Sequence, residues 1–291
     1  MASLVYHAGA LGDFITTLPA IGAWRRLHPG EGTVLLGKPA LALLALPAFD
    51  QTWDAEGAEL SALFSLPFAA TQRLADLLRQ FSSALLFAAP SSPIPSALAA
   101  LGVKEIVRQD PLPSLPVPIV DYHLSLFPGL SFDAASSQPR VAIPELEPDS
   151  VRATVSVHPG SGSALKNWPR ERFSELCRRL SREGESVAWI TGPAEADGAA
   201  PQGVREWRGF SLPVLAALLA RSKVYIGNDS GVTHLAAAAG CPTIALFGAS
   251  DPRVWAPRGS VVRVIISSSG DMAGISVDDV WGVVRPMLGQ C

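Results

Sequence analysis

One segment near the carboxyl end, residues 224–255, constrains the fold of this chain more than any other. Its sequence, VYIGNDSGVTHLAAAAGCPTIALFGASDPRVW, predicts a β-strand that ends at Gly227, a polar turn, a helix rich in small residues and a second apolar strand. Asn228, Asp229 and Ser230 therefore lie where a strand ends and a helix begins. Ligands of α/β sheets bind at that edge, and the free N–H groups and dipole of a helix N-terminus favour an anion.

The residue types in this turn add a second chemistry to the anion site. Ser230 is suited to cap the helix, and Gly231 lets a ligand approach the first helical turn closely. Phosphate binding alone requires no acidic residue, whereas the carboxylate of Asp229 and the imidazole of His234 can hold sugar hydroxyls. A sugar attached to a phosphate satisfies both observations. Helix capping is the alternative interpretation of Asp229, and packing in the core is that of His234.

Strand-like and helix-like patterns alternate along almost the whole chain, which predicts parallel α/β sheets. In the first half, the apolar runs typical of buried strands are Leu4–His7, Thr33–Gly37, Ala84–Ala88 and Glu105–Arg108. Helical patterns begin near Asp13 and extend across Thr71–Gln80. The alternation resumes after a break and continues from Thr154 to Ile266.

The break is a proline-rich segment, Gln138–Ser150, with prolines at 139, 144 and 148. Repeated proline continues neither a helix nor a central strand, so this segment indicates a linker. A chain of 291 residues is expected to form two domains of ordinary size. We therefore predict domains at 1–140 and 151–275, followed by a C-terminal helix within 276–291.

The composition indicates a folded protein, with 48% hydrophobic and 17% charged residues. The formal charge of −3 argues against a nucleic-acid partner. Residues 1–20 lack the pattern of a signal peptide, and no apolar run approaches the ~20 residues that span a bilayer. Cys177, Cys241 and Cys291 have no metal-ligand spacing, and the first two are interpreted as small buried side chains. These features favour the reducing cytoplasm, with a peripheral membrane contact as a further expectation.

Three ordered segments carry a resemblance to a known family. They are HAGALGDFITTLPAIGAWRRLHPG near the amino terminus, VSVHPGSGSALKNWPRERFSELCRRL in mid-chain, and GNDSGVTHLAAAAG followed by PTIALFGASDPRVWAP. DYHLSLFPGL before the linker is a weaker fourth match. At these residues the chain resembles the ADP-heptose:lipopolysaccharide heptosyltransferases, glycosyltransferase family 9.

The resemblance implies an α/β protein of the GT-B fold, with two doubly wound, Rossmann-like domains facing across a cleft. By analogy, the last helix, Ser276–Leu288, packs back on the first domain. The implied activity is inverting transfer of a sugar, heptose on this analogy, from an ADP-linked donor. The acceptor would be a hydroxyl of a lipopolysaccharide core or a related glycan or glycolipid. No DxD-type acidic pair stands out, so we predict independence of metal ions and of other cofactors.

Asp13 is the candidate general base for this reaction. It follows the acceptor-side residues Gly9, Ala10, Leu11 and Gly12 in a turn after the first predicted strand. The attacking hydroxyl must lose a proton, and a positioned carboxylate typically contributes roughly 10²–10⁴-fold to such a step. A helix N-cap is the alternative role for an aspartate at this position.

Lys166 is the candidate phosphate ligand, because it lies above a turn whose glycine and serines offer further donors. Fixed donors of this kind stabilise a leaving diphosphate most in the transition state. A solvated surface lysine is the alternative. The full donor-binding set is Lys166, Ser161, Gly162, Ser163, Asp229, Ser230, Gly231, Val232, Thr233 and His234.

Three further features of the sequence have alternative roles. Glu195 and Gly192 follow a predicted strand end and suit a ribose hydroxyl. Trp168 and Trp255 either wall the nucleotide pocket or pack in the core. The run Trp24–Arg26 faces either an anionic acceptor or membrane, or simply solvent.

The first half departs from the family in two ways. Residues 89–118 contain seven prolines where regular structure is expected, and His7 stands where the family often has lysine or arginine. Because the first domain carries the acceptor site in the family that the chain resembles, these departures bear on the identity of the acceptor more than on that of the donor. Two alternative functions therefore stay open, a GT-B-type nucleotide-sugar epimerase and a non-catalytic nucleotide-sugar-binding protein.

Overall fold

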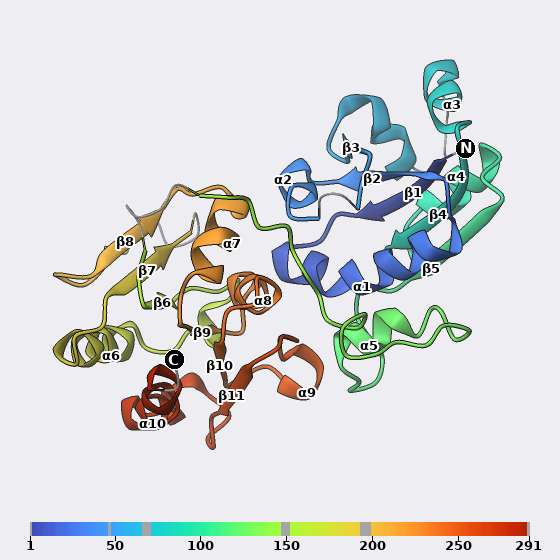
Figure 1. Cartoon of the computed structure of the whole chain (residues 1–291). Helices are drawn as coiled ribbons and strands as arrows, with labels where there is room; N and C mark the ends of the chain where they lie inside the picture. The colour runs from blue at the N-terminus through green and yellow to red at the C-terminus, as the bar shows by residue number, and fades with distance from the viewer. Residues whose placement is uncertain (1, 46–47, 66–70, 147–151, 193–198, 290–291) are drawn as a thin grey trace. The chain divides into compact units, whose positions relative to one another are not determined.

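The computed structural model describes residues 2–45, 48–65, 71–146, 152–192 and 199–289 (Figure 1). Contacts divide the chain into two compact units. The first comprises Met1–Leu115 with Val120–Ser137, and the second comprises Pro116–Ile119 with Gln138–Cys291. The long segment of the second unit begins at Gln138, where the sequence predicts the linker to begin, and residues 138–146 form neither helix nor strand.

The first unit is built on a parallel sheet of five strands in the order β3-β2-β1-β4-β5. The strands are β1 (Ala2–His7), β2 (Gly32–Gly37), β3 (Gln51–Asp54), β4 (Phe81–Phe87) and β5 (Glu105–Gln109). The helical segments in this part are α1 (Leu11–Leu27), α2 (Pro39–Ala42), η1 (Ala58–Phe64), α3 (Gln72–Leu78), α4 (Ile94–Ala100) and α5 (Ile119–Leu124). The order reverses between β1 and β4, so the sheet is doubly wound and its ligand edge lies at the carboxyl ends of these strands.

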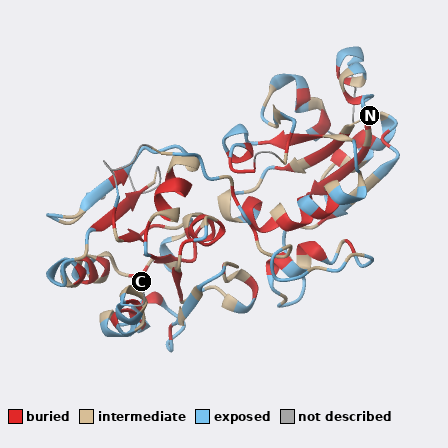
Figure 2. Cartoon of the chain, in the orientation of Figure 1, coloured by how far each residue is buried: buried red, intermediate tan, exposed pale blue. Residues whose placement is uncertain are grey.

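The central strands form where the sequence is apolar over several residues, because both faces of such strands are covered. Leu4 and Val5 of β1 and Leu85 of β4 are fully buried, and Figure 2 shows this sheet as largely buried. All four strands predicted in this half are present. The edge strand β3 escapes prediction because its sequence, QTWD, has no apolar run and none of its residues is buried.

Regular structure continues through much of the proline-rich stretch, residues 89–118. Pro93 and Pro95 lie at the start of α4, where a missing N–H breaks no helical hydrogen bond. β5 follows, and the four prolines between residues 110 and 118 lie outside helices and strands. Regular structure is therefore retained in α4 and β5 despite the prolines, and the irregular parts of this stretch are the connecting segments.

The second unit contains a parallel sheet of six strands in the order β11-β10-β9-β6-β7-β8. The strands are β6 (Val155–His158), β7 (Val187–Thr191), β8 (Arg205–Arg208), β9 (Val224–Asn228), β10 (Thr243–Phe247) and β11 (Val262–Ile266). The helical segments are η2 (Ala164–Lys166), α6 (Arg170–Arg182), α7 (Leu212–Ala220), α8 (Gly231–Ala238), α9 (Pro252–Trp255), η4 (Met272–Gly274) and α10 (Val277–Leu288). This order reverses between β6 and β9, so the second sheet is doubly wound as well.

The last helix, α10, contributes to the core of the second unit. Val280, Trp281 and Val284 belong to the same buried cluster as Cys177 of α6, whose predicted burial is confirmed. Burial raises the pKa of the Cys177 thiol to about 12, so the side chain behaves as a small hydrophobe. Packing of α10 onto the first domain, suggested by analogy, stays a prediction. None of the described helices is long and apolar enough to cross a bilayer.

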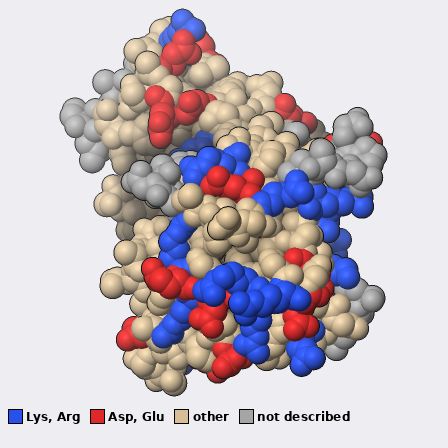
Figure 3. Space-filling model, turned by 90° about the vertical axis from the view of Figure 1, so that its left-hand side faces the viewer, with Lys and Arg blue, Asp and Glu red and all other residues tan. Residues whose placement is uncertain are grey.

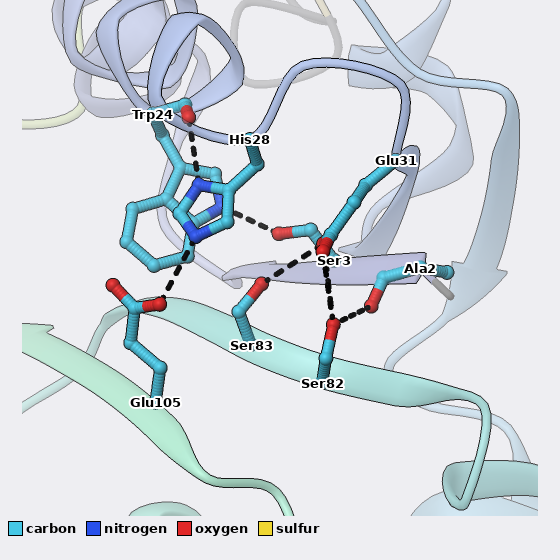
Figure 4. A network of polar contacts seen from close by, with 8 residues as sticks. All are labelled: Ala2, Ser3, Trp24, His28, Glu31, Ser82, Ser83 and Glu105. Carbon is cyan, nitrogen blue, oxygen red and sulfur yellow. Dashed lines mark hydrogen bonds and ion pairs between the residues drawn. The ribbon is translucent and has the colours of Figure 1, made fainter.

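The amino edge of the first sheet carries a polar network that begins at Trp24 (Figure 4). Trp24 is 1% exposed, and its indole N–H donates to the hydroxyl of Ser3. The Trp24–Arg26 run therefore does not form a single surface, since only its arginines reach solvent. Arg26 lies over the ring of Phe132, with 5.4 Å between the guanidinium carbon and the ring centroid.

His28 extends this network toward β5 (Figure 4). Its Nδ1 is 2.9 Å from the carbonyl oxygen of Trp24, and its Nε2 is 3.1 Å from Oε2 of Glu105. Both partners are acceptors when the carboxyl is ionised, so the doubly protonated imidazolium satisfies both contacts. Nearby, Glu31 accepts hydrogen bonds from two serine hydroxyls of β4.

Candidate functional site

The ligand edge of the second sheet is formed by the loops that follow β6 and β9. His158 at the end of β6 pairs in register with Gly227 of β9, so the two loops leave the sheet side by side. α8 begins directly after the β9 loop. Ser230 caps it, as the sequence predicts, because its Oγ accepts from the Thr233 N–H at 3.4 Å. A capped helix N-terminus at this edge is a binding position for an anion.

Lys166 and Asp229 form an ion pair at this edge. Lys166 lies at the end of η2, and its Nζ is 2.7 Å from Oδ2 of Asp229. The Asp229 side chain is only 8% exposed, whereas that of Lys166 is 36% exposed. The Asp229 N–H donates to the Leu246 carbonyl on β10 at 3.1 Å, which fixes the backbone of the aspartate. The fold thus brings together the predicted phosphate ligand and a predicted sugar ligand.

Asn228 joins the segments that form this edge, a role that sequence analysis did not assign. Its side chain is fully buried. Oδ1 accepts from the Trp168 N–H at 3.0 Å, and Nδ2 donates to the Pro159 carbonyl at 2.7 Å. One amide therefore connects β9 to the loop after β6 and to the segment before α6. The signal available in the sequence is an amide side chain at the end of a buried strand.

The loop over residues 161–163 is shaped from within by Ser161. Its Oγ lies 2.7 Å from the Ser163 carbonyl and 2.7 Å from Oδ1 of Asn167, and it accepts from the Ser163 N–H at 3.2 Å. Gly162 is exposed, and a Cβ added there would meet no atom within 4 Å. The Ser161 hydroxyl thus stabilises the loop, and direct contact of this loop with phosphate stays a prediction.

The first turn of α8 contains residues of contrasting exposure. Thr233 is fully buried, and its hydroxyl donates to the Asn228 carbonyl and lies 3.0 Å from the Tyr225 hydroxyl. Gly231 and Val232 are half-buried, and His234 is 6% exposed. Thr233 therefore organises the helix start, while ligand contacts of Thr233 and its neighbours stay predictions.

The segment predicted to hold the ribose is described only in part. Gly192 follows β7, and Glu195 lies outside the described residues. On the adjacent strand β8, Glu206 accepts from the Thr191 hydroxyl at 2.8 Å and pairs with Arg208 at 2.8 Å. Hydrogen bonds from Arg208 and Thr191 lower the pKa of Glu206. Sequence analysis missed this carboxylate, although the alternating polar residues of REWR are typical of an edge strand.

Trp168 packs in the core, as one of its two interpretations holds. It is 1% exposed, and its ring centroid is 4.8 Å from that of Phe173 in an edge-on contact. Its indole N–H donates to the Ile275 carbonyl at 2.8 Å. Trp255 is half-buried. Trp168 therefore anchors the segment that follows Lys166 to the core of the second unit.

In the first unit, Asp13 is the third residue of α1 and is exposed. Its Oδ2 accepts from the Ala10 N–H at 3.1 Å, so the carboxylate does stabilise the helix start. A carboxylate has about four lone-pair sites, and this bond uses one of them. The capping role is therefore present in the structure, and the general-base role stays a prediction alongside it.

His7 lies at the end of β1, close to the same turn. It is 3% exposed, its Nδ1 has no hydrogen-bond partner among the described residues, and its ring contacts Phe14 edge-on at 5.3 Å. Burial lowers the pKa of His7 to about 4, with Asp13 opposing this shift and Lys38 adding to it. The imidazole is thus neutral at neutral pH, unlike the lysine or arginine common at this position in the family.

Gly9 separates this imidazole from Asp13. A Cβ at Gly9 would lie 2.9 Å from Cε1 of His7 and 3.2 Å from both Cβ and Oδ2 of Asp13. Contacts this short would force the side chain of His7 or Asp13 to shift. The turn therefore needs glycine at this position to hold His7 and Asp13 where they are.

Two doubly wound parallel sheets, with the predicted donor residues at the edge of the second, define an α/β protein of the GT-B fold. The family model for glycosyltransferase family 9 (heptosyltransferase) matches residues 114–280, which is more than half of the chain. The chain belongs to this family.

Comparison with individual proteins gives the same relationship. The chain is 29% identical over 159 residues to lipopolysaccharide heptosyltransferase 3 of Escherichia coli, covering 48% of this chain and 47% of that protein. The solved structure of a family 9 glycosyl transferase from Veillonella parvula DSM 2008 has a TM-score of 0.78 at 18% identity, covering 100% of this chain and 97% of that one. E. coli heptosyltransferase WaaC with ADP has a TM-score of 0.72 at 18% identity, covering 99% and 100%. The curated match spans about half of the relative's length, whereas the fold is shared throughout.

Proposed function

We propose that this protein is an inverting glycosyltransferase that moves heptose from ADP-heptose to a hydroxyl of a lipopolysaccharide core or a related glycan. The observation that carries the proposal is the Lys166–Asp229 pair beside the capped N-terminus of α8, within the region that the family model matches. Lys166 and the N–H groups of α8 suit the donor diphosphate. Asp229 suits the hydroxyls of the donor sugar. Heptose is proposed as that sugar because the similar proteins include lipopolysaccharide heptosyltransferases 3 and 2.

In this reaction the acceptor oxygen attacks the anomeric carbon while its proton passes to the carboxylate of Asp13. The bond between that carbon and the diphosphate breaks, and ADP leaves with the electron pair. Lys166 and the amide donors at α8 stabilise the charge that develops on the leaving oxygen. A base in the position of Asp13 contributes roughly 10²–10⁴-fold.

The leaving diphosphate does not require a metal ion in this proposal. The Lys166 ammonium and the positive end of the α8 dipole supply the positive charge. Transfer is therefore expected to proceed at an unchanged rate in a chelator. A loss of transfer in chelator that added Mg²⁺ or Fe²⁺ restores would contradict this part of the proposal.

We place the activity in the cytoplasm, in peripheral contact with the inner membrane where a lipid-linked acceptor is available. α6 carries five arginines, of which Arg178 and Arg182 are exposed. Figure 3 shows basic side chains interleaved with acidic ones on the face that it presents. The exposed arginines favour contact with anionic headgroups, and the interleaved acidic side chains keep that contact weak and salt-sensitive. Flotation with phosphatidylglycerol vesicles, but not with phosphatidylcholine vesicles, is the expected result.

The test is incubation of the protein with ADP-heptose and a series of truncated lipopolysaccharide cores, with ADP release and the mass of the acceptor as readouts. Asp13→Asn is expected to abolish transfer while leaving donor affinity unchanged. Asp76→Asn is the matched control, because Asp76 is an exposed helical aspartate of the same unit that pairs with Arg79. Transfer by Asp13→Asn at the wild-type rate would refute the role of the base.

The same assay separates the two alternative functions. Epimerised or free sugar released from ADP-heptose without an acceptor would indicate an epimerase. Tight binding of ADP-heptose with no turnover on any core would indicate a non-catalytic nucleotide-sugar-binding protein.

A further inference from the structure

We propose that Asp229 makes the second unit discriminate between a nucleotide sugar and the nucleotide diphosphate that remains after transfer. It does so by competing with the diphosphate for Lys166 whenever no sugar hydroxyl is bound. This inference rests on the proposed function, since it concerns the donor of the same site.

The competition follows from the geometry of the free site. Lys166 Nζ lies 2.7 Å from Oδ2 of Asp229, so the cation that suits the diphosphate is already engaged. Among the described residues, Lys166 is the only cation paired with this carboxylate. Asp229 is 8% exposed, so water compensates little for its charge if Lys166 leaves.

A nucleotide diphosphate without a sugar therefore binds at a disadvantage. Its phosphates must draw Lys166 away, which leaves the Asp229 carboxylate buried, unpaired and close to a second anion. A partly exposed ion pair such as this one opposes binding by about fivefold in affinity.

A nucleotide sugar avoids this disadvantage because its sugar carries hydroxyl donors. A hydroxyl that donates to Asp229 replaces the bond lost from Lys166, and hydrogen bonds to an ionised acceptor are about twice as strong as neutral ones. Lys166 is then free to contact the diphosphate. The Lys166–Asp229 pair thus opens without loss only when the ligand carries both a sugar and a diphosphate.

The same exchange helps to release the product. When the sugar has moved to the acceptor, Asp229 loses its hydroxyl partner and Lys166 returns to it. The diphosphate then loses its cation, and the departure of the nucleotide is accelerated.

The experiment is isothermal titration of ADP and of ADP-heptose, without acceptor, into the wild-type protein, Asp229→Asn and Lys166→Gln. Asp229→Asn is expected to bind ADP about fivefold more tightly than the wild type, because Lys166 is no longer held. Its preference for ADP-heptose over ADP is expected to fall by about fivefold, since a neutral amide accepts a weaker hydrogen bond. Lys166→Gln is expected to bind both ADP and ADP-heptose more weakly than the wild type.

Asp278→Asn is the matched control, because it removes one negative charge from the same unit at an exposed pair with Arg179. It is expected to leave both affinities unchanged. Thermal melting establishes that each variant is folded, and Asp229→Ser removes the same charge if the asparagine variant does not fold.

Two outcomes separate this inference from the proposed function. Unchanged or weaker ADP binding in Asp229→Asn, with ADP binding still dependent on Lys166, would overturn the competition and leave the donor site standing. Failure of the folded wild-type protein to bind either ligand would refute the proposed function, and the inference with it.

Discussion

Removal of the Asn228 amide is the most direct test of how the donor edge is held together. This side chain is fully buried, and it bonds to the Trp168 N–H at 3.0 Å and to the Pro159 carbonyl at 2.7 Å. In Asn228→Ala both backbone groups lose their partner while they stay buried. Each buried unsatisfied group costs about 1–3 kcal/mol, so we expect the free energy of unfolding to fall by about 2–6 kcal/mol. That is a large share of the roughly 5–15 kcal/mol typical of a folded protein.

Urea unfolding followed by tryptophan fluorescence measures this loss, because five of the seven tryptophans lie in the second unit. With a slope of about 2–3 kcal/mol/M, the midpoint is expected to fall by about 1–3 M. Asn167→Ala is the matched control, since Asn167 is half-buried and accepts one bond from Ser161. It is expected to cost less than about 1 kcal/mol. A loss for Asn228→Ala no larger than that of the control would refute the reasoning.

Asn228→Asp adds a test of the individual bonds. One oxygen still accepts from the Trp168 N–H, but the other faces the Pro159 carbonyl, which is also an acceptor. At neutral pH this variant is expected to be at least as destabilised as Asn228→Ala, because an ionised carboxylate is buried beside a carbonyl. Burial raises the pKa of the introduced carboxyl in the folded state above its unfolded value. Stability is therefore expected to recover as the pH falls through the folded pKa, whereas Asn228→Ala is expected to show no such recovery.

Three further predictions concern other parts of the chain. Burial lowers the pKa of His28, but hydrogen bonds to a backbone carbonyl and to Glu105 outweigh it and raise the pKa above 6.5. The free energy of unfolding of the wild type relative to His28→Gln, measured by urea, is therefore expected to be highest below pH 6.5 and to fall as the pH rises through the folded pKa, by under ~1 kcal/mol because Glu105 is exposed. Gly9→Ala is expected to slow transfer by about 10–100-fold with donor affinity unchanged, since the added methyl displaces Asp13; equal kcat values would contradict this. Val284→Ala is expected to lower the free energy of unfolding by about 2 kcal/mol through a cavity under α10, measured by the urea midpoint.

The elements that sequence analysis predicts most reliably are the central strands. Their continuous apolar runs have one physical explanation, burial on both faces, as in β1 and β4. The edge strand β3 carries no such pattern, because one side of it is open to solvent and its residues are free to be polar. The prolines of α4 likewise suggest irregularity until their position in the first helical turn is known.

The site was predictable as far as local sequence determines it. Ser230 caps α8 because the cap depends on residues within three positions along the chain. The pairing of Lys166 with Asp229 was not predictable from spacing, because the two residues are 63 positions apart and only the strand order brings them together. The neutral state of His7 is likewise a consequence of burial, which the residue type alone does not reveal.

The adjacency of β6 and β9 has a consequence for the order in which the chain folds. The bonds that join the two loops of the donor edge connect residues 60 to 69 positions apart. At a synthesis rate of about 5–20 residues per second, the β6 side of the site leaves the ribosome roughly 3–14 seconds before the β9 side. During that interval one edge of β6, a buried strand, has no partner, and an unpaired strand edge is a template for incorrect pairing. The strand that leads into the donor-binding turn, β9, is thus also the strand that pairs with the free edge of β6, so a chain truncated before Val224 is expected to aggregate rather than to retain a weakened site.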